Sequence, residues 1–297
     1  MRIGIDIGGT KIEAIALDDT GAEVLRHRVP TPRSHYPALL EAIRDLVLSF
    51  EGQLGTDSTV GVGHPGVISP ATGQIKNSNS LALLGKKLDA DLANVLERRV
   101  RLANDADCFA LSEAVDGAGA GSATVFGVIL GTGVGGGVVV SGRLIHGPNA
   151  IAGEWGHNPL PPSAAGPVEL LECYCGRSGC VEKYLSGPGL AADHLSAYGT
   201  AMTAVEVNAA AQAGEPEAAA TLARYVERLA AGLAVVINVL DPEAIVLGGG
   251  VSNIQALYAR VPERWGGYVF SDRVDTRLVQ NVHGDSSGVR GAAWLWD

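Results

Sequence analysis

The sequence contains no long apolar segment and is poor in positive charge. No stretch approaches the ~18 consecutive apolar residues that a membrane span needs, and the apolar opening around Ile3 and Ile5 is too short for a signal peptide. Lys and Arg total 22 against 32 Asp and Glu, for a net charge of -10. Because nucleic-acid binding requires clustered cations, we expect a cytoplasmic protein that binds neither nucleic acid nor membrane.

Low-complexity linkers and short-period repeats are also absent, and cysteines are few. The chain has 297 residues, of which 46% are apolar, enough to bury the cores of two domains. Its four cysteines are expected to be thiols or metal ligands, because disulfides are rare in the cytoplasm.

The first part of the chain has the pattern of an α/β domain. Strands are expected at 2–7, 12–17, 22–28, 59–63 and 100–103, with helices at 36–50, 91–98 and 106–116. Glycine-rich residues 117–121 then indicate a hinge.

The opening pattern returns after that hinge. Strands are expected at 123–130, 138–140 and 244–247, with helices at 187–212 and 215–239. The tract Ile129 to Gly133 repeats the features of Asp6 to Thr10. We therefore predict a duplicated α/β core with a cleft between its halves. The expected domains are 1–117, joined by a C-terminal helix at 285–297, and 118–284.

Three glycine-rich turns follow the predicted strands. A turn that holds phosphate needs backbone N–H groups without an obstructing Cβ, which Gly8-Gly9-Thr10-Lys11 and Gly131 to Gly137 satisfy. Asp6 suits a water-mediated contact to Mg²⁺. A tight hairpin whose glycines only permit positive φ is the alternative for Gly8-Gly9. Gly248-Gly249-Gly250 suits an adenosine contact or a simple turn.

A polar pair, Asn104-Asp105, ends a predicted strand, where ligand sites of α/β proteins usually lie. A carboxylate there can accept the proton that a sugar hydroxyl loses as it attacks a γ-phosphate. Asp105 fits that role and Asn104 fits a sugar hydroxyl. The alternative for Asp105 is the N-cap of the following helix, and Asp107 is a rival base.

Three cysteines and one histidine have the composition of a zinc site. Cys173, Cys175 and Cys180 form C-x-C-x₄-C, and His157 lies upstream. Three thiolates and one imidazole make a closed, structural tetrahedral set. Glu154 and Glu182 bracket the loop and suit neighbouring sugar hydroxyls, although isolated glutamates are usually solvated. Cys108 is expected to be a small core residue.

These tracts together resemble the ROK family of repressors, open reading frames and sugar kinases. The matching segments are 6–11, 102–105, 130–133, 153–157, 173–182 and 246–250. The finer similarity, at 76–80, 155–161 and 283–294, is to the bacterial fructokinases of this family, also called mannokinases.

The resemblance implies the actin-like, hexokinase-type ATPase fold with ATP and Mg²⁺ in the interdomain cleft. It implies Asp105 as general base and sugar contacts from Asn104, Glu154, His157 and Glu182, with Asn79, Pro65 and Gly66 beside them. The implied ATP contacts come from the glycine-rich turns, namely Asp6, Gly8, Gly9, Thr10, Lys11, Gly131, Thr132, Gly133, Gly135, Gly248, Gly249 and Gly250. His157 and the three cysteines would hold structural zinc, and a homodimer is expected.

Two features depart from the family pattern. His64 precedes Pro65 where an apolar residue is usual, and loop 161–172 is rich in Pro and Ala. The expected reaction is phosphorylation of a hexose at the 6-hydroxyl, with fructose first and mannose second. The alternatives are a glucokinase, an N-acetylhexosamine kinase or, remotely, a sugar-responsive regulator without its DNA-binding domain.

Overall fold

The computed structural model describes residues 1–32, 35–78, 80–163, 165–166 and 169–296. By internal contacts the chain forms two compact units. Unit 1 comprises 1–121, 137–152 and 282–297, and unit 2 comprises 122–136 and 153–281. The predicted domain boundaries at 117 and 284 stay a prediction, because contact density alone does not show that either part folds independently.

Unit 1 is built from a five-stranded sheet with helices. Its elements are β1 (Arg2–Ile7), β2 (Lys11–Leu17), β3 (Glu23–Pro30), α1 (Tyr36–Leu54), β4 (Thr59–His64), β5 (Val67–Ile68), β6 (Ile75–Lys76), α2 (Leu88–Val95), β7 (Arg101–Asn104), α3 (Asp105–Val115), β10 (Arg143–Leu144), η3 (Gly284–Ser286) and α10 (Ser287–Ala293). The sheet order is β3-β2-β1-β4-β7, with β1, β4 and β7 parallel and β2 and β3 antiparallel to their neighbours.

Unit 2 contains most of a second sheet and the longest helix. Its elements are β8 (Thr124–Leu130), the first residues of β9 (Val134–Val140), η1 (Trp155–His157), α4 (Glu182–Leu185), α5 (Gly187–Tyr198), α6 (Ala204–Gln212), α7 (Pro216–Leu240), β11 (Ala244–Gly248), η2 (Gly250–Asn253), α8 (Ala256–Arg260), α9 (Pro262–Trp265) and β12 (Arg277–Gln280). The second sheet has the order β10-β9-β8-β11-β12. This is the same order of connections as in the first sheet, so the duplicated pattern is confirmed.

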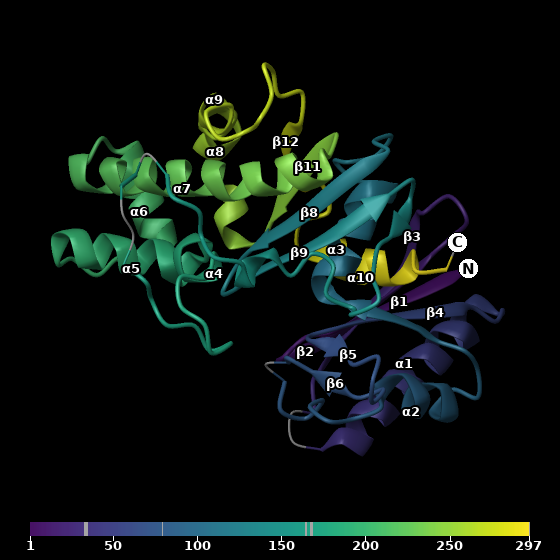
Figure 1. Ribbon diagram of the computed structural model, residues 1–297. Coiled ribbons are helices and arrows are strands. Elements are labelled where there is room, and N and C mark those ends of the chain that lie inside the picture. Colours follow the sequence, from purple (N-terminus) through teal and green to yellow (C-terminus); the bar gives the residue numbers. More distant parts are fainter. Residues whose placement is uncertain (33–34, 79, 164, 167–168, 297) are drawn as a thin grey trace. The chain divides into compact units, whose positions relative to one another are not determined.

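The alternation of side chains along β1 explains how helices cover both faces of the first sheet. Ile3 and Ile5 are fully buried in a core shared with α1 and α2. Gly4 lies on the opposite face, where a Cβ would come within 2.1 Å of the Val289 carbonyl in α10. The glycine therefore lets the C-terminal helix pack directly on β1. Figure 1 shows this helix in yellow beside the purple first strand.

Three predicted helices differ in length from the observed ones. The helix expected at 36–50 continues to Leu54. The expected helix at 187–212 is interrupted, because Gly199 adopts φ 73° after α5 and Thr203 begins α6 with a capping box. The expected helix at 285–297 is shorter, and α10 ends at Ala293. Beyond it, the Trp296 indole donates to the Val60 carbonyl at 2.7 Å, which holds the last residues on β4. Within the described residues, no helix combines the length and apolarity that a membrane crossing requires.

Candidate active site

The turn between β1 and β2 in unit 1 is the first predicted phosphate loop. Gly8 N–H donates to the Lys11 carbonyl at 3.0 Å, and the Thr31 hydroxyl donates to the Gly8 carbonyl at 2.7 Å. A Cβ on Gly8 would lie 2.8 Å from the Lys11 carbonyl oxygen, whereas one on Gly9 would meet nothing within 4 Å. The loop does join two antiparallel strands. Neither glycine has positive φ, however, so the alternative that these glycines serve only to permit positive φ is wrong.

Lys11 forms an ion pair within this unit. Its ammonium lies 3.3 Å from the Glu13 carboxylate, which is 2% exposed and also pairs with Arg26 and Arg28. Burial acts to raise the pKa of Glu13, but the hydrogen bond and charge of Arg28 and the charge of Lys11 hold it below its usual range. The predicted contact of Lys11 with phosphate stays a prediction.

Asp6 lies at the carboxyl end of β1 among other acidic groups. Burial, together with the negative charges of Asp105 and Glu13, raises the pKa of Asp6 to about 7 against the opposing charge of Lys11. A Cβ on Gly288, at the start of α10, would lie 3.8 Å from the Asp6 carboxyl group. The carboxyl groups of Asp6 and Asp105 are close enough for one charge to affect the other, an arrangement that favours a bound cation. Carboxylate oxygens are ligands that suit Mg²⁺.

Asn104 and Asp105 stand where β7 passes into α3. The Asn104 Oδ1 accepts from Ala106 N–H at 2.9 Å and its Nδ2 donates to the Gly66 carbonyl at 2.9 Å. Asn104 is thus the N-cap, and the alternative interpretation of Asp105 as the N-cap is wrong. Asp105 is the first helical residue and is exposed, with Oδ1 accepting from Ala106 N–H at 2.8 Å. Asp107, the rival base, is partly buried, with an oxygen 3.9 Å from His146 Nδ1.

The Pro65-Gly66 turn leaves the end of β4. Gly66 has φ 84°, and a Cβ there would lie 2.6 Å from the Lys76 carbonyl, so glycine is required. His64 is 1% exposed, and its burial lowers the pKa to about 4, which keeps the ring neutral. Its Nδ1–H donates to the Pro65 carbonyl at 3.3 Å, so His64 is a core side chain. Asn79 lies outside the described residues.

The second predicted phosphate loop joins β8 to β9 in unit 2. Gly131 N–H donates to the Gly133 carbonyl at 3.0 Å, and Gly187 N–H donates to the Gly131 carbonyl at 2.8 Å. The Glu182 carboxylate accepts from Val134 N–H at 3.0 Å. A Cβ on Gly133 would lie 2.6 Å from this carboxylate, but one on Gly131 would meet nothing closer than 3.9 Å. Glu182 therefore supports the glycine loop.

The triple-glycine turn after β11 lies beside this second loop. Gly249 has φ 80°, and a Cβ there would lie 2.6 Å from the Leu130 carbonyl at the end of β8. A Cβ on Gly250 would meet nothing within 4 Å, and Gly248 is the last residue of β11. The Gly135 carbonyl accepts from the Trp155 indole at 3.1 Å. Thr132, like Thr10 in the first loop, is exposed. The two glycine turns of unit 2 are thus neighbours.

The predicted sugar-binding glutamates of unit 2 lie near the cysteine loop. Glu154 is exposed and precedes η1, which contains His157. Desolvation and the negative charges of Glu182, Cys173 and Glu154 raise the pKa of Tyr174 to about 12. The carboxylates of Glu154 and Glu182 are therefore close enough for their charges to affect the Tyr174 hydroxyl. This end of unit 2 thus offers several hydrogen-bonding groups to a polyol.

The four predicted zinc ligands converge. One donor atom from each of His157, Cys173, Cys175 and Cys180 lies within 4.8 Å of the others. The Cys173 sulfur is 3.6 Å from His157 Nδ1, and the Cys175 and Cys180 sulfurs are 3.6 Å apart. Zinc–sulfur bonds of ~2.3 Å in a tetrahedron place two sulfurs ~3.8 Å apart. The residues therefore fit zinc, which would fix the loop with no position left for substrate.

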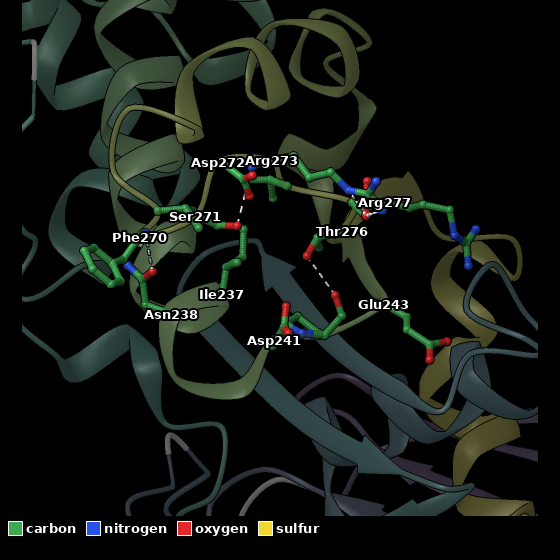
Figure 2. A pocket seen from close by; sticks show the side chains of 14 residues that line it. Ile237, Asn238, Asp241, Glu243, Phe270, Ser271, Asp272, Arg273, Thr276 and Arg277 are labelled. Carbon is green, nitrogen blue, oxygen red and sulfur yellow. Dashed lines mark hydrogen bonds and ion pairs between the residues drawn. The ribbon is translucent and has the colours of Figure 1, made fainter.

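A cavity of about 1130 Å³ elsewhere in unit 2 contains none of the predicted site residues. Figure 2 shows that its lining comes from the end of α7, residues 241–243 and the segment 269–277. Residues 241–243 precede β11 and segment 269–277 ends at the first residue of β12, whereas the glycine turn 248–250 follows β11. Ligand sites of α/β folds gather at the carboxyl ends of parallel strands, so this cavity is not the candidate site.

Known proteins provide the decisive comparison. The family model described as "ROK family" matches residues 2–297. The chain belongs to the ROK family. It is 40% identical over 299 residues to an N-acetyl-D-glucosamine kinase of Yersinia pseudotuberculosis, with 99% of this chain and 98% of the relative covered.

Solved ROK structures confirm the fold. The ROK hexokinase of Thermus thermophilus matches with a TM-score of 0.87 and 31% identity, covering 99% of this chain and 96% of that one. A ROK glucokinase of Streptomyces griseus, solved with glucose and AMPPNP, matches with a TM-score of 0.77 and 28% identity over 99% and 98% of the two chains. The hexokinase-type fold of two α/β sheets is therefore confirmed.

Three side chains that contribute to these features escaped the sequence analysis. Thr31 and Glu13 act through strand pairing, and nothing in their local pattern marks them. Tyr174 stands between two predicted ligands, so its position in Cys-Tyr-Cys was a usable signal.

Proposed function

We propose that this chain is an ATP-dependent N-acetylhexosamine kinase that phosphorylates the 6-hydroxyl, with N-acetyl-D-glucosamine as its first candidate substrate. The observation that carries the proposal is the 40% identity to an N-acetyl-D-glucosamine kinase across 99% of this chain. Sugar phosphorylation is the reaction class of such ROK kinases. Fructose, the substrate expected from the finer sequence similarity, has no support among these relatives.

Asp105 is proposed as the general base. Its carboxylate is exposed at the first turn of α3. As the sugar oxygen bonds to the γ-phosphorus of ATP, the bond to the β-phosphate oxygen breaks and the hydroxyl proton passes to Asp105. The products are ADP and the sugar 6-phosphate.

Asn104 and Gly66 are proposed to shape the sugar side of unit 1. Both polar atoms of the Asn104 side chain bond to backbone groups, at Ala106 and Gly66. This network fixes the turn that precedes Asp105. Positioning of a reacting hydroxyl supplies much of the rate of phosphoryl transfer.

The nucleotide side is proposed to use Asp6 and the glycine loops. Bound Mg²⁺ would neutralise the developing phosphate charge, and Asp6 would hold it through water. A Cβ on Gly9, Gly131 or Gly250 would meet no protein atom closer than 3.9 Å, which leaves room for a phosphate to approach the backbone at these positions. Glu154, His157 and Glu182 are proposed to bind the sugar in unit 2.

The test is ADP release with N-acetyl-D-glucosamine for the wild type and Asp105→Asn. General-base catalysis contributes about 10²–10⁴-fold, so kcat should fall by at least ~10² while ATP still binds. Asp107→Asn is the matched control and should retain most of the activity. Normal turnover by Asp105→Asn would show that Asp105 is not the general base. Absence of turnover by the wild type would show that N-acetyl-D-glucosamine is not the substrate.

A glucokinase is the second candidate. The observation that favours it is the similarity to the Streptomyces griseus enzyme solved with glucose, at 28% identity. Glucose differs from N-acetyl-D-glucosamine only at the 2-position, so the same assay with both sugars separates the two candidates.

A further inference from the structure

Tyr174 combines an exposed ring with a hydrogen-bonded hydroxyl beside the zinc ligands. The residue is 79% exposed, yet its oxygen lies 3.0 Å from His157 Nε2. Its ring meets the imidazole edge-on, with centroids 5.2 Å apart and planes at 87°. An exposed tyrosine held in this way by one partner has a defined orientation.

The two nitrogens of His157 face different partners. Nδ1 is 3.6 Å from the Cys173 sulfur, whereas Nε2 faces the Tyr174 oxygen. A neutral imidazole has one N–H donor and one acceptor nitrogen, and only the acceptor can bind a metal. Because Nδ1 lies on the side of the cysteine sulfurs, the proton belongs on Nε2.

We propose that Tyr174 is a positioning residue for the zinc centre, because its hydroxyl oxygen accepts the Nε2–H of His157 and thereby presents Nδ1 as the ligand atom. A histidine ligand commonly donates its other N–H to a fixed acceptor that sets both the tautomer and the ring orientation. The inference concerns the metal centre and does not depend on which sugar the enzyme phosphorylates.

The bond has a consequence for the predicted sugar contact of His157. With Nδ1 directed at the metal site and Nε2–H donated to Tyr174, a sugar hydroxyl that binds His157 must displace the Tyr174 hydroxyl from Nε2. The hydroxyl of Tyr174 keeps its own proton to donate. A sugar contact at this position would therefore come from Tyr174 or require the bond between Tyr174 and His157 to open.

The direct test is the zinc affinity of Tyr174→Phe, measured by competition with a chromogenic chelator. Phenylalanine keeps the ring contact and removes only the hydroxyl. Loss of such a partner typically weakens metal binding about 10–100-fold, and we expect about tenfold, because water can replace an exposed hydroxyl.

Tyr184→Phe is the matched control. Tyr184 lies in α4, and its hydroxyl accepts from Leu171 N–H at 3.3 Å and donates to the Glu169 carbonyl, so the variant loses bonds to the nearby segment that do not involve His157. Equal weakening in both variants would show general loosening of the loop and would overturn the proposal.

Nitrogen-15 NMR of zinc-loaded protein supplies a readout independent of activity and affinity. The signals of His157 are assigned by comparison with His157→Gln. We expect a metal-bound Nδ1 and a protonated Nε2 in the wild type, and signals of both tautomers or exchange broadening in Tyr174→Phe. Metal on Nε2, or wild-type protein that binds no zinc, would overturn the proposal, while sugar specificity is decided by the separate kinase assay.

Discussion

The two glycine loops occupy equivalent places in two sheets with the same strand order, but different groups support them. The first loop is held by the hydroxyl and N–H of Thr31, which follows β3. The second is held by the Glu182 carboxylate and by Gly187 N–H, from the segment after the cysteine loop. The duplicated strands therefore put a glycine loop at the same position in each sheet, while different residues support the loop in each unit.

The glycines of each loop divide into two kinds. Gly8 is needed by the fold, because a Cβ there would lie 2.8 Å from the Lys11 backbone carbonyl oxygen, and a Cβ on Gly133 would lie 2.6 Å from the Glu182 carboxylate, which would have to move. A Cβ on Gly9 or Gly131 would meet no protein atom closer than 3.9 Å. We infer that Gly9 and Gly131 are glycines because a bound ligand approaches the backbone there. Substitutions at both kinds of position test this distinction.

Among substitutions in the two glycine loops and their supports, the largest effect is expected from Glu182→Ala. Without the carboxylate, Val134 N–H loses its acceptor, and a hydrogen bond to a charged group is worth about 1.5–3 kcal/mol. If half of that loss falls on the transition state, kcat/KM for ATP falls about 4- to 13-fold. Glu182→Gln keeps an acceptor oxygen and should fall less. Equal losses in the two variants would show that charge, and not loop support, is the contribution of Glu182.

A smaller effect on stability is expected from Gly133→Ala. The new Cβ displaces the Glu182 carboxylate, which lies 2.6 Å from its position, and overpacking costs about 1–3 kcal/mol. For a protein of this size that lowers Tm by several degrees. Gly131→Ala is the control and should leave Tm nearly unchanged. The distinction fails if both variants melt alike.

In the first loop, Thr31→Val should cost about 1 kcal/mol, the usual value of a neutral hydrogen bond. Valine keeps the shape of the side chain and removes the donor to the Gly8 carbonyl. Denaturant unfolding measures the loss, and Thr72→Val, on an exposed turn, is the control. A change no greater than in the control would show that the strands alone hold the first loop.

The smallest effect on stability is expected from Gly9→Ala, since its Cβ enters open space. Tm should stay unchanged while the KM for ATP rises, because the methyl group obstructs a phosphate that approaches the backbone. An unchanged KM for ATP would show that Gly9 is an ordinary turn residue with no contact to the nucleotide.

Sequence reasoning recovered features that depend on local pattern. The two sheets follow from alternating strands and repeated glycine turns, and the metal cluster follows from the spacing of Cys173, Cys175 and Cys180 with His157 upstream. The observed approach of these donor atoms, all within 4.8 Å, agrees with that reasoning. Such signals are recoverable because neighbouring residues carry them.

Features that depend on distant contacts were missed or assigned wrongly. Asn104 caps α3 through its Oδ1, where the alternative interpretation placed Asp105, and its Nδ2 also donates to the Gly66 carbonyl, 38 positions away in the chain. The brace from Thr31 to Gly8 joins residues 23 positions apart. The sugar was expected to be fructose because of the finer similarity at 76–80, 155–161 and 283–294, whereas single hydroxyl contacts that those tracts do not place decide specificity.

The most direct test of the proposed function is a competition in one vessel. N-acetyl-D-glucosamine, glucose, mannose and fructose are supplied at equal concentration with limiting ATP, and the sugar phosphates are quantified by mass spectrometry and NMR. The account predicts that N-acetyl-D-glucosamine 6-phosphate is the main product. Fructose 6-phosphate as the main product would contradict it.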